Sequence, residues 1–159
     1  ITTHQDIKNV SKKITSEMII KKIKKINKWF VSKKKRKPKI AVLGLNPHNS
    51  EYRKNSEEIK IIIPAIKKLK KFKINLNGPY SSDTIFINDY KKFDVIVGMY
   101  HDQVLSPFKA LFKYDAINMT LGLNYIRVSP DHGTAFNLIK KNKASAESLQ
   151  RCFDYFNNL

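Results

Sequence analysis

The sequence predicts an α/β fold in which helices alternate with buried strands. Two short apolar runs, IAVLGL at 40–45 and DVIVGMY at 94–100, have the length and the β-branched content of strands that are buried on both faces. Residues 14–30 and 56–72 carry apolar residues at steps of three and four positions, which predicts helices. This alternation of helix and buried strand is typical of a parallel sheet covered by helices.

The first predicted helix has a recognisable start and end. Thr15 is a candidate N-cap, with Glu17 in the first turn. The basic, proline-containing segment SKKKRKPK at 32–39 is expected to be a linker that ends the helix. The apolar stripe of this helix comprises Ile19, Ile23, Ile26 and Phe30.

The second predicted helix carries an internal proline. Asn55 and Glu58 have the spacing of a capping box, and Pro64 is expected to kink the helix. Its inward positions are Ile59, Ile62, Ile63, Ile66 and Leu69. The segment NGPYSSDT at 77–84 is rich in turn residues and is expected to be a turn.

The last third of the chain predicts shorter elements. Residues 117–130 are expected to form one or two strands interrupted by Gly122. Apolar residues at 135–139 indicate helical structure, and a terminal helix is expected over 145–159.

The composition describes a strongly basic chain of the size of one domain. The 159 residues include 31 Lys+Arg against 13 Asp+Glu, a net charge of +18. Such a charge favours anionic partners, such as nucleic acid, a membrane surface or phosphorylated substrates. The arginines are few, however, and arginine dominates specific phosphate and base recognition. Lysines on solvated helix faces therefore account for most of the charge.

Other features of the composition bear on location. The single cysteine, Cys152, excludes an internal disulfide, so a reducing cytoplasm is the simplest compartment. No apolar run approaches the roughly 18 residues of a membrane span. The start ITTHQDIKNV lacks both an initiator Met and the features of a signal peptide, so we expect a fragment of a longer protein.

Three histidines stand where the predicted elements begin or end. His48 and His101 closely follow the runs at 40–45 and 94–100, and His4 precedes the first helix. Ligands of open α/β sheets bind beyond the carboxyl ends of the strands. Neutral imidazole is a common ligand of divalent metals, and three protein ligands are typical of catalytic metal sites. The spacing matches no short metal motif, so these residues alone leave a hydrogen-bonding role open.

Five segments together resemble the 4-hydroxythreonine-4-phosphate dehydrogenases of vitamin B6 (pyridoxine) biosynthesis. They are TTH, GLNPHNSE, NGPYSSDT, MYHDQVLSPFK and NMTLGLNYIRVSPDHGTAF, and they occur in the order of the family. The resemblance covers nearly all of this chain but only about the C-terminal half of the family enzyme. It implies a partial fold of the isocitrate/isopropylmalate dehydrogenase type, a cytoplasmic homodimer, and a missing N-terminal half.

The resemblance also implies a metal site. His4, His48 and His101 match the family's ligands for a divalent metal, which is zinc, magnesium or cobalt. In the family this metal is shared across the dimer interface, with the counterpart of His101 supplied by the other subunit. Asp83 and Asp102 match acidic residues that line the site and are candidate catalytic residues. Asp102 is expected to orient the His101 ring or to act as an acid or base.

The remaining matches concern substrate and cofactor. Lys109, Asn118 and Arg127 match residues that hold the phosphorylated substrate. Asp131 and His132 match a loop that binds NAD or NADP. The chain has no GxGxxG after a strand, which agrees with the different cofactor site of the implied fold.

The chemistry of the family explains these residue types. A secondary alcohol is oxidised by hydride transfer to NAD(P)⁺, and the resulting β-keto acid loses CO₂. A divalent cation lowers the pKa of the alcohol and then stabilises the enolate. Lysine and arginine supply positive charge for the phosphate or carboxylate.

The chain departs from the family pattern at two loops. NPHNSE stands where family members commonly have NPHAGE followed by further glycines, so we expect less freedom for positive φ there. After DHGTAF the family usually has a glycine-containing turn. Here the sequence is IKKNK, and Asn142 is the best candidate for a left-handed position.

Three alternatives remain open. A sister dehydrogenase of threonate or erythronate 4-phosphate would share the metal, Lys109 and Arg127. A nucleic-acid-binding module would use residues 17–30 and the basic linker, although no stacking platform or known binding motif appears. An inactive remnant is the third. Because the resemblance implies a missing N-terminal half, we expect the isolated chain to expose apolar surface and to be inactive or severely impaired as a dehydrogenase.

Overall fold

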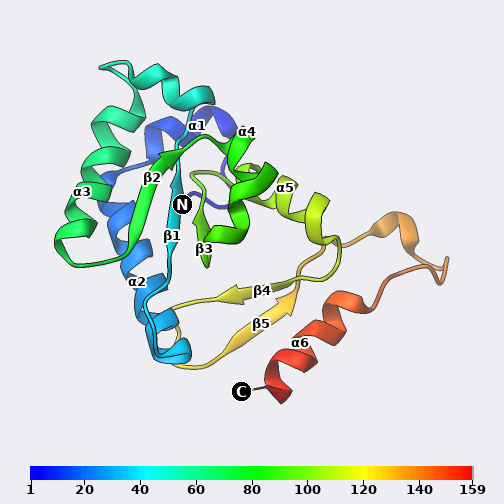
Figure 1. The fold of residues 1–159 in the computed structure, drawn as a ribbon. Coiled ribbons are helices and arrows are strands. Elements are labelled where there is room, and N and C mark those ends of the chain that lie inside the picture. The colour runs from blue at the N-terminus through cyan, green and yellow to red at the C-terminus, as the bar shows by residue number, and fades with distance from the viewer. Residues whose placement is uncertain (159) are drawn as a thin grey trace. The chain divides into compact units, whose positions relative to one another are not determined.

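The computed structural model describes residues 1–158 (Figure 1). The α/β class is confirmed. The chain divides into two compact units, Ile1–Pro107 and Phe108–Leu159. We describe each unit by itself.

The first unit is built on a three-stranded parallel sheet. The strands are β1 (Ile40–Leu43), β2 (Leu76–Tyr80) and β3 (Val95–Val97), in the order β2-β1-β3 (Figure 1). The predictions of strands at 40–45 and 94–100 are therefore confirmed, with shorter bounds. All four residues of β1 are buried, as expected for a central strand.

β2 corrects the prediction of a turn at 77–84. Residues Leu76–Tyr80 form an edge strand of the described sheet, in which β1 is their one neighbour, and proline is tolerated at such an edge. Gly78 has a φ of +145°, and a Cβ there would lie 2.3 Å from the carbonyl oxygen of Val42. Glycine and proline thus allow close approach to β1, whereas in sequence they look like turn residues. The short helix α4 (Ser82–Thr84) follows.

Two helices precede β1: α1 (Ile7–Lys13), which was not predicted, and α2 (Ser16–Lys34). The Thr15 N-cap is confirmed, because its side chain accepts a hydrogen bond from the Met18 N–H at 3.2 Å. The helix ends later than expected, at a left-handed Lys35, so the first residues of the presumed linker 32–39 are helical.

The helix around Pro64 begins as a π-helix, Glu58–Ile62, and continues as α3 (Ile63–Lys71). Proline has no N–H for the regular helical bond, and the wider π-helical turn lies just before Pro64. The expected kink stays a prediction. The predicted capping box is wrong. Ser56, rather than Asn55, accepts a hydrogen bond from the helix, and the Glu58 carboxylate bonds elsewhere.

The core of the first unit lies on both faces of β1. On one face α1, α2 and α3 bury a large apolar cluster that includes Val10, Ile19, Ile23, Ile40, Val42, Ile62, Ile66, Leu69 and Met99. On the other face Ala41 and Leu43 pack with Ile85 and its partly buried neighbours. Alternate residues of β1 therefore face opposite sides, as strand geometry requires.

Further short elements connect the strands of this unit. They are η1 (Pro47–Tyr52), η3 (Ile85–Asp89) and η4 (Tyr90–Lys92). Helix α5 (His101–Phe112), which was not predicted, begins after β3 and spans the boundary at Pro107.

The second unit contains an antiparallel hairpin and one helix. The hairpin pairs β4 (Ile117–Thr120) with β5 (Arg127–Pro130), which confirms the prediction for 117–130. Helix α6 (Glu147–Asn157) packs on both strands and confirms the terminal helix. The expected helical structure at 135–139 reduces to the short η5 (Phe136–Leu138). Within residues 1–158, no helix is long and apolar enough to cross a membrane.

Candidate functional site

The predicted site residues fall into one group in each unit. His4, His48, Asp83, His101 and Asp102 belong to the first unit. The second unit holds the predicted substrate and cofactor residues: Lys109, Asn118, Arg127, Asp131 and His132.

His48 lies beyond the carboxyl end of β1, in η1. Its imidazole is largely exposed, and Nδ1 lies 3.8 Å from Oδ2 of Asp83. Residues 48–52 all have a positive φ, between 49° and 55°. The expectation that loss of glycine would restrict positive φ here is therefore wrong. For non-glycine residues this conformation costs roughly 1–2 kcal/mol each, so the surrounding contacts must hold the segment.

Glu58 anchors the loop just before this segment, and the sequence did not identify it as more than a cap. Its fully buried carboxylate accepts hydrogen bonds from the N–H groups of Leu45 and Asn46, both at 2.8 Å, and from the Asn46 side chain. Burial alone would raise the pKa of Glu58, but the bonds from Asn46 and Leu45 outweigh it and lower that pKa. Glu58 lies four residues before Ile62 and so shares the buried face of the helix. A charged residue at such a position is the sequence signal by which Glu58 could have been identified.

His4 and His101 lie side by side beyond the end of β3. Their ring centroids are 5.4 Å apart, with a tilt of 40° between the planes. His101 is the first residue of α5. Its Nδ1 lies 2.6 Å from Oδ1 of Asp102. An Nδ1–H that donates to this carboxylate leaves Nε2 free to bind a metal, which is the usual arrangement of a metal-binding histidine.

Two of the three predicted metal ligands lie close enough together in one chain to bind one divalent metal. His4 and His101 are near enough for a nitrogen of each to contact a single ion. His48 is paired with Asp83 instead, and residues 1–158 contain no group of three His, Cys, Asp or Glu side chains that could hold a metal. The resemblance assigned His101 to the other subunit, whereas the structure brings His101 beside His4 in the same chain.

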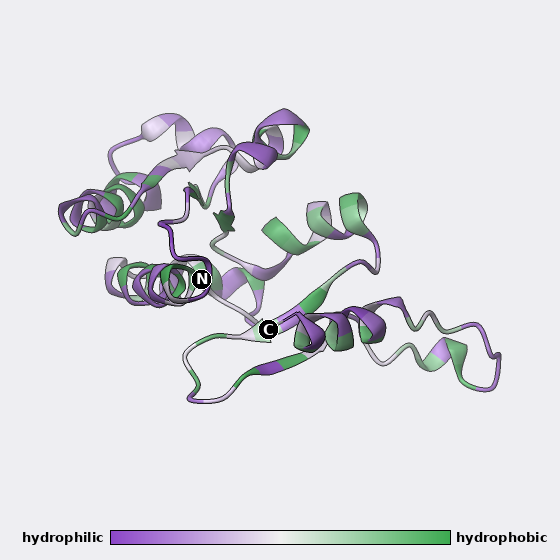
Figure 2. Cartoon of the chain, turned by 60° about the horizontal axis from the view of Figure 1, so that its bottom comes forward, coloured by the Kyte–Doolittle hydropathy of each residue, from purple (hydrophilic) through white to green (hydrophobic). Residues whose placement is uncertain are grey.

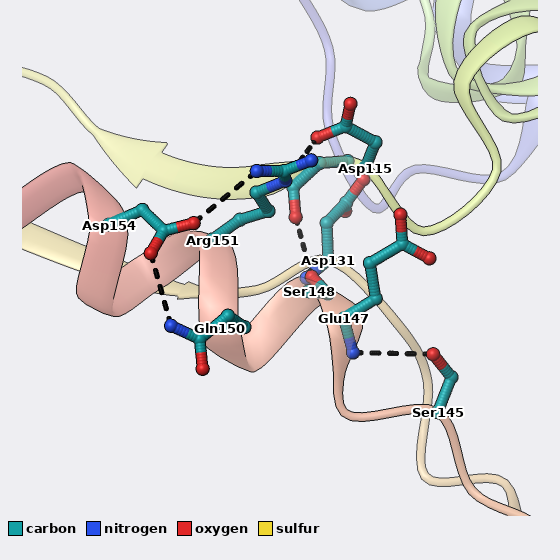
Figure 3. Close-up of polar contacts among 9 residues, drawn as sticks. Asp115, Asp131, Ser145, Glu147, Ser148, Gln150, Arg151 and Asp154 are labelled. Atoms are coloured by element: carbon teal, nitrogen blue, oxygen red, sulfur yellow. Dashed lines mark hydrogen bonds and ion pairs between the residues drawn. The ribbon is translucent and has the colours of Figure 1, made fainter.

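Lys109 and Asp131 form an ion pair in the second unit. Lys109 Nζ lies 2.9 Å from Asp131 Oδ2 and also donates to the Asp131 carbonyl. The Asp131 N–H donates to Ser148 Oγ at 2.8 Å, and the Ser148 hydroxyl donates to the Ala116 carbonyl at 2.5 Å (Figure 3). A predicted substrate residue and a predicted cofactor residue are therefore in direct contact. Ser148, on α6, was missed because a serine in an amphipathic helix carries no distinctive signal.

Asn118 and Arg127 lie on one face of the hairpin. Asn118 is on β4, two residues before Thr120, and Arg127 is directly opposite Thr120 on β5. Opposite residues of paired strands share a face, as do residues two apart. Arg127 Nη1 donates to Thr120 Oγ1 at 3.1 Å. Both predicted residues are exposed.

A pocket of about 590 Å³ lies beside Lys109 and His132. Its other lining residues are mainly small or apolar: Tyr114, Gly133, Thr134, Ala135, Leu138, Ile139, Ala144 and Ser145. The volume is within the usual range of small-molecule and cofactor sites. Asn142, near this pocket in sequence, has a φ of +52°, which confirms the predicted left-handed position.

Comparisons with known proteins identify the relatives of this chain. Residues 1–155 match the family described as "Pyridoxal phosphate biosynthetic protein PdxA". The chain is 50% identical over 150 residues to the 4-hydroxythreonine-4-phosphate dehydrogenase of Sulfurihydrogenibium sp., and 48% over 149 residues to that of Aquifex aeolicus. Each alignment covers 93% of this chain and 46% of the relative, so the chain spans about half the length of these curated relatives.

Solved structures agree with the sequence relatives. The crystal structure of 4-hydroxythreonine-4-phosphate dehydrogenase from Klebsiella pneumoniae matches with a TM-score of 0.83 at 34% identity, over 96% of this chain and 47% of that one. A terephthalate 1,2-cis-dihydrodiol dehydrogenase from Burkholderia xenovorans has a TM-score of 0.74 at 22% identity, over 95% of this chain and 48% of that one. This second match shows a shared fold alone.

Proposed function

Because the chain belongs to the pyridoxal phosphate biosynthetic protein PdxA family, we propose that it forms the C-terminal part of a 4-hydroxythreonine-4-phosphate dehydrogenase. The reaction would be NAD(P)-linked oxidation of 4-phosphohydroxy-L-threonine followed by decarboxylation. The observation that carries the proposal is the His4–His101 pair, with Asp102 bonded to His101. We further propose the isocitrate/isopropylmalate dehydrogenase type of fold for the whole enzyme, and a cytoplasmic homodimer.

His4 and His101 would hold the divalent metal. When bound, the metal supplies a Lewis acid for the alcohol oxygen and for the enolate. A proton on His101 Nδ1 that is donated to Asp102 would leave Nε2 to bind the metal. His48 is the third proposed ligand, brought in by a movement of η1 or by a second copy of the chain. Asp83, which faces His48, is positioned to orient that imidazole or to move a proton.

Lys109, Asn118 and Arg127 would bind the phosphorylated substrate. Lys109 and Arg127 supply two positive charges, and the Asn118 amide can donate a hydrogen bond. In this structure the Lys109 ammonium is neutralised by Asp131, so a phosphate must compete with that carboxylate. Asp131 and His132, with the adjacent pocket, are the proposed contacts for NAD or NADP.

Two other functions are weaker. A sister dehydrogenase of threonate or erythronate 4-phosphate would use the same charged residues, and only substrate assays separate it. A nucleic-acid-binding module is disfavoured because Arg36 is engaged by Asp94 and Arg151 by Asp115. These two arginines are held by carboxylates of the same chain.

Metal affinity of the purified chain tests the proposal. Isothermal titration with Zn²⁺ should detect a site in the wild type, and His4→Ala or His101→Ala should abolish it. Loss in His48→Ala as well would support the third ligand. His132→Ala, an exposed histidine outside this group, is the matched control and should bind normally. Unchanged binding in both His4→Ala and His101→Ala would contradict the proposed site.

Substrate choice is best tested in a protein of the full length of the relatives. We expect the isolated chain to be inactive or severely impaired, since it spans about half of its relatives. A chimera carrying the N-terminal half of the Sulfurihydrogenibium relative should reduce NAD(P)⁺ with 4-phosphohydroxy-L-threonine. A preference for erythronate 4-phosphate would favour the sister enzyme. Full activity of the isolated chain would refute the expectation of impairment.

A further inference from the structure

We propose that Thr2 and Gln103 are positioning residues that hold His4 and His101 side by side through the backbone of Met99. The inference rests on the proposed function only in treating the histidine pair as a metal site. The hydrogen bonds that support the inference are all within this chain and do not involve a metal. Thr2 and Gln103 occur in the TTH and MYHDQ segments, yet the proposed chemistry gives neither a role.

Met99 is the point where the two segments meet. It is fully buried and lies two residues after the end of β3. Its carbonyl accepts two hydrogen bonds from Thr2, one from the backbone N–H at 2.9 Å and one from Oγ1 at 2.8 Å. Its N–H donates to Gln103 Oε1 at 2.6 Å. Both polar groups of the Met99 backbone are thus bonded to these two residues.

Gln103 also connects the ends of two strands. Its Nε2 donates to the carbonyl of Gly44 at 2.6 Å, and Gly44 directly follows β1. The same side chain therefore ties the carboxyl ends of β1 and β3 together. The packing around it is tight, because a Cβ at Gly98 would lie 2.6 Å from Val104 and 3.2 Å from Gln103 Oε1.

Because each bonded residue is only two positions from a histidine, these bonds also place the two imidazole rings. Thr2 precedes His4 by two residues, and Met99 precedes His101 by two residues. Fixing Thr2 on Met99 therefore fixes the starting points of both histidines. The result is the centroid separation of 5.4 Å, although 97 residues separate the two bonded positions.

Both side chains are buried, so their hydrogen bonds offset the cost of burying polar groups. Thr2 is 5% exposed and Gln103 is 6% exposed. A buried amide or hydroxyl is costly unless it is hydrogen-bonded, and an apolar residue would fill the same space without that requirement. The alternative is a purely structural role, in which the bonds stabilise the fold without affecting the metal site.

Matched substitutions distinguish positioning from stability. Thr2→Val removes the hydroxyl at constant shape, Thr2→Ser restores it, and Thr3→Val is an exposed neighbour for comparison. Gln103→Met removes both bonds, and Gln150→Met makes the same change at an exposed glutamine. Thr2→Val and Gln103→Met should weaken Zn²⁺ binding by about 10–100-fold, as removal of supporting groups does in metal sites. The other three variants should bind as the wild type does.

A second measurement does not depend on the metal. In metal-free protein with labelled histidines, NMR should show a nuclear Overhauser effect between the His4 and His101 rings, and Thr2→Val and Gln103→Met should weaken it. If wild type shows this effect but binds no Zn²⁺, the proposed metal fails and the positioning role stands. If the effect is absent in wild type, or if both variants keep it with normal Zn²⁺ affinity, the inference is overturned.

The test still works if Thr2→Val or Gln103→Met fails to fold. Circular dichroism and thermal melting identify a variant that does not fold. In that case Gln103→Glu, which keeps the acceptor for Met99 and loses the donor to Gly44, takes its place. A lowered melting temperature with unchanged ring proximity and Zn²⁺ affinity would identify a purely structural role and exclude positioning.

Discussion

The two compact units differ in how they bury apolar side chains. In the first unit β1 is covered on both faces, and aliphatic side chains from three helices pack against one of them. In the described part of the second unit, the buried residues are Ala116, Ser148 and Cys152. Figure 2 shows hydrophobic segments along its hairpin and α6. Its large exposed apolar residues are Leu111, Phe112, Tyr114, Leu123, Tyr125, Ile126, Phe136, Ile139, Leu149, Phe153 and Phe156.

The difference follows from the number of layers in each unit. A hairpin with one helix can cover one face only, so aromatic and aliphatic side chains remain at the surface. Exposed apolar surface of this extent is typical of a surface that another part or partner covers. The expectation of exposed apolar surface is therefore confirmed, and we propose that the rest of the enzyme covers it.

The two groups of site residues, one in each unit, also differ in how they are supported. The histidine pair stands at strand ends supported by a packed core. Lys109 and Asp131 depend on polar contacts, chiefly Ser148. On the same helix as Ser148, Arg151 pairs with Asp115 and Asp154 (Figure 3). We expect the second group to be the more easily disturbed.

The largest expected effect compares the same substitution in the two units. Leu69 in α3 is fully buried and Leu149 in α6 is 46% exposed. Leu69→Ala should lower the free energy of unfolding by about 2–5 kcal/mol, because it leaves a cavity. Leu149→Ala should change it by less than about 0.5 kcal/mol. Urea unfolding followed by Trp29 fluorescence and by circular dichroism measures both.

An equal loss of unfolding free energy in Leu69→Ala and Leu149→Ala would contradict the difference between the units, because it would reveal a packed core in the second unit. Trp29, in α2, is the single tryptophan and reports on the first unit. Circular dichroism reports on both units.

The second prediction concerns the polar support of the second unit. Ser148→Ala removes a buried hydroxyl that joins Asp131 to Ala116 and leaves the Asp131 N–H without that acceptor. The expected cost is about 1–3 kcal/mol. Hydrogen exchange should quicken at the Asp131 amide while β1 stays protected. Ser145→Ala, at an exposed serine that accepts one bond from the Glu147 N–H at 3.3 Å, is the control and should have little effect. Faster exchange throughout the first unit would contradict a local role.

The sequence predicted the elements whose signal is local. The stripe of α2, the Thr15 cap and the apolar runs of β1 and β3 all depend on residues close in the chain. α5 was missed because HDQVLSPFKALF contains Pro107, a residue that by local preference ends or breaks a helix. β2 was missed because Gly78 and Pro79 are turn residues by local preference, and only β1 makes them a strand.

The candidate site was less predictable for the same reason. The resemblance supplied His4, His48 and His101 by motif. The pairing of His4 with His101 depends on a bond between residues 2 and 99 that no local pattern contains. Ser148 was likewise recognisable only from the distant groups that it contacts.

The smallest expected effect lies at the surface of the first unit and depends on pH. The Asp94 carboxylate accepts two hydrogen bonds from Arg36, at 2.6 and 2.8 Å, and one from the Lys39 N–H at 2.8 Å. The bonds from Arg36 and then from Lys39 lower the pKa of Asp94 to about 2. They join the end of α2 to the start of β3, next to the packed sheet. Asp94→Asn should therefore destabilise the protein at pH 7, by less than Ser148→Ala, because the site is partly exposed and an amide oxygen can still accept from Lys39.

The sign of the pH dependence follows from the lowered pKa. The pKa of an aspartate in an unfolded chain is about 3.9. The contribution of ionised Asp94 to the free energy of unfolding is therefore complete above that pH and is lost as the pH falls toward about 2. Wild type and Asp94→Asn should thus differ in melting temperature at pH 7 and converge between about pH 4 and pH 2. Asp89→Asn, at an exposed carboxylate paired with Lys92 within one helical turn, should differ little from wild type at any pH. A difference for Asp94→Asn that persists unchanged at pH 2 would show that shape, rather than charge, stabilises this junction.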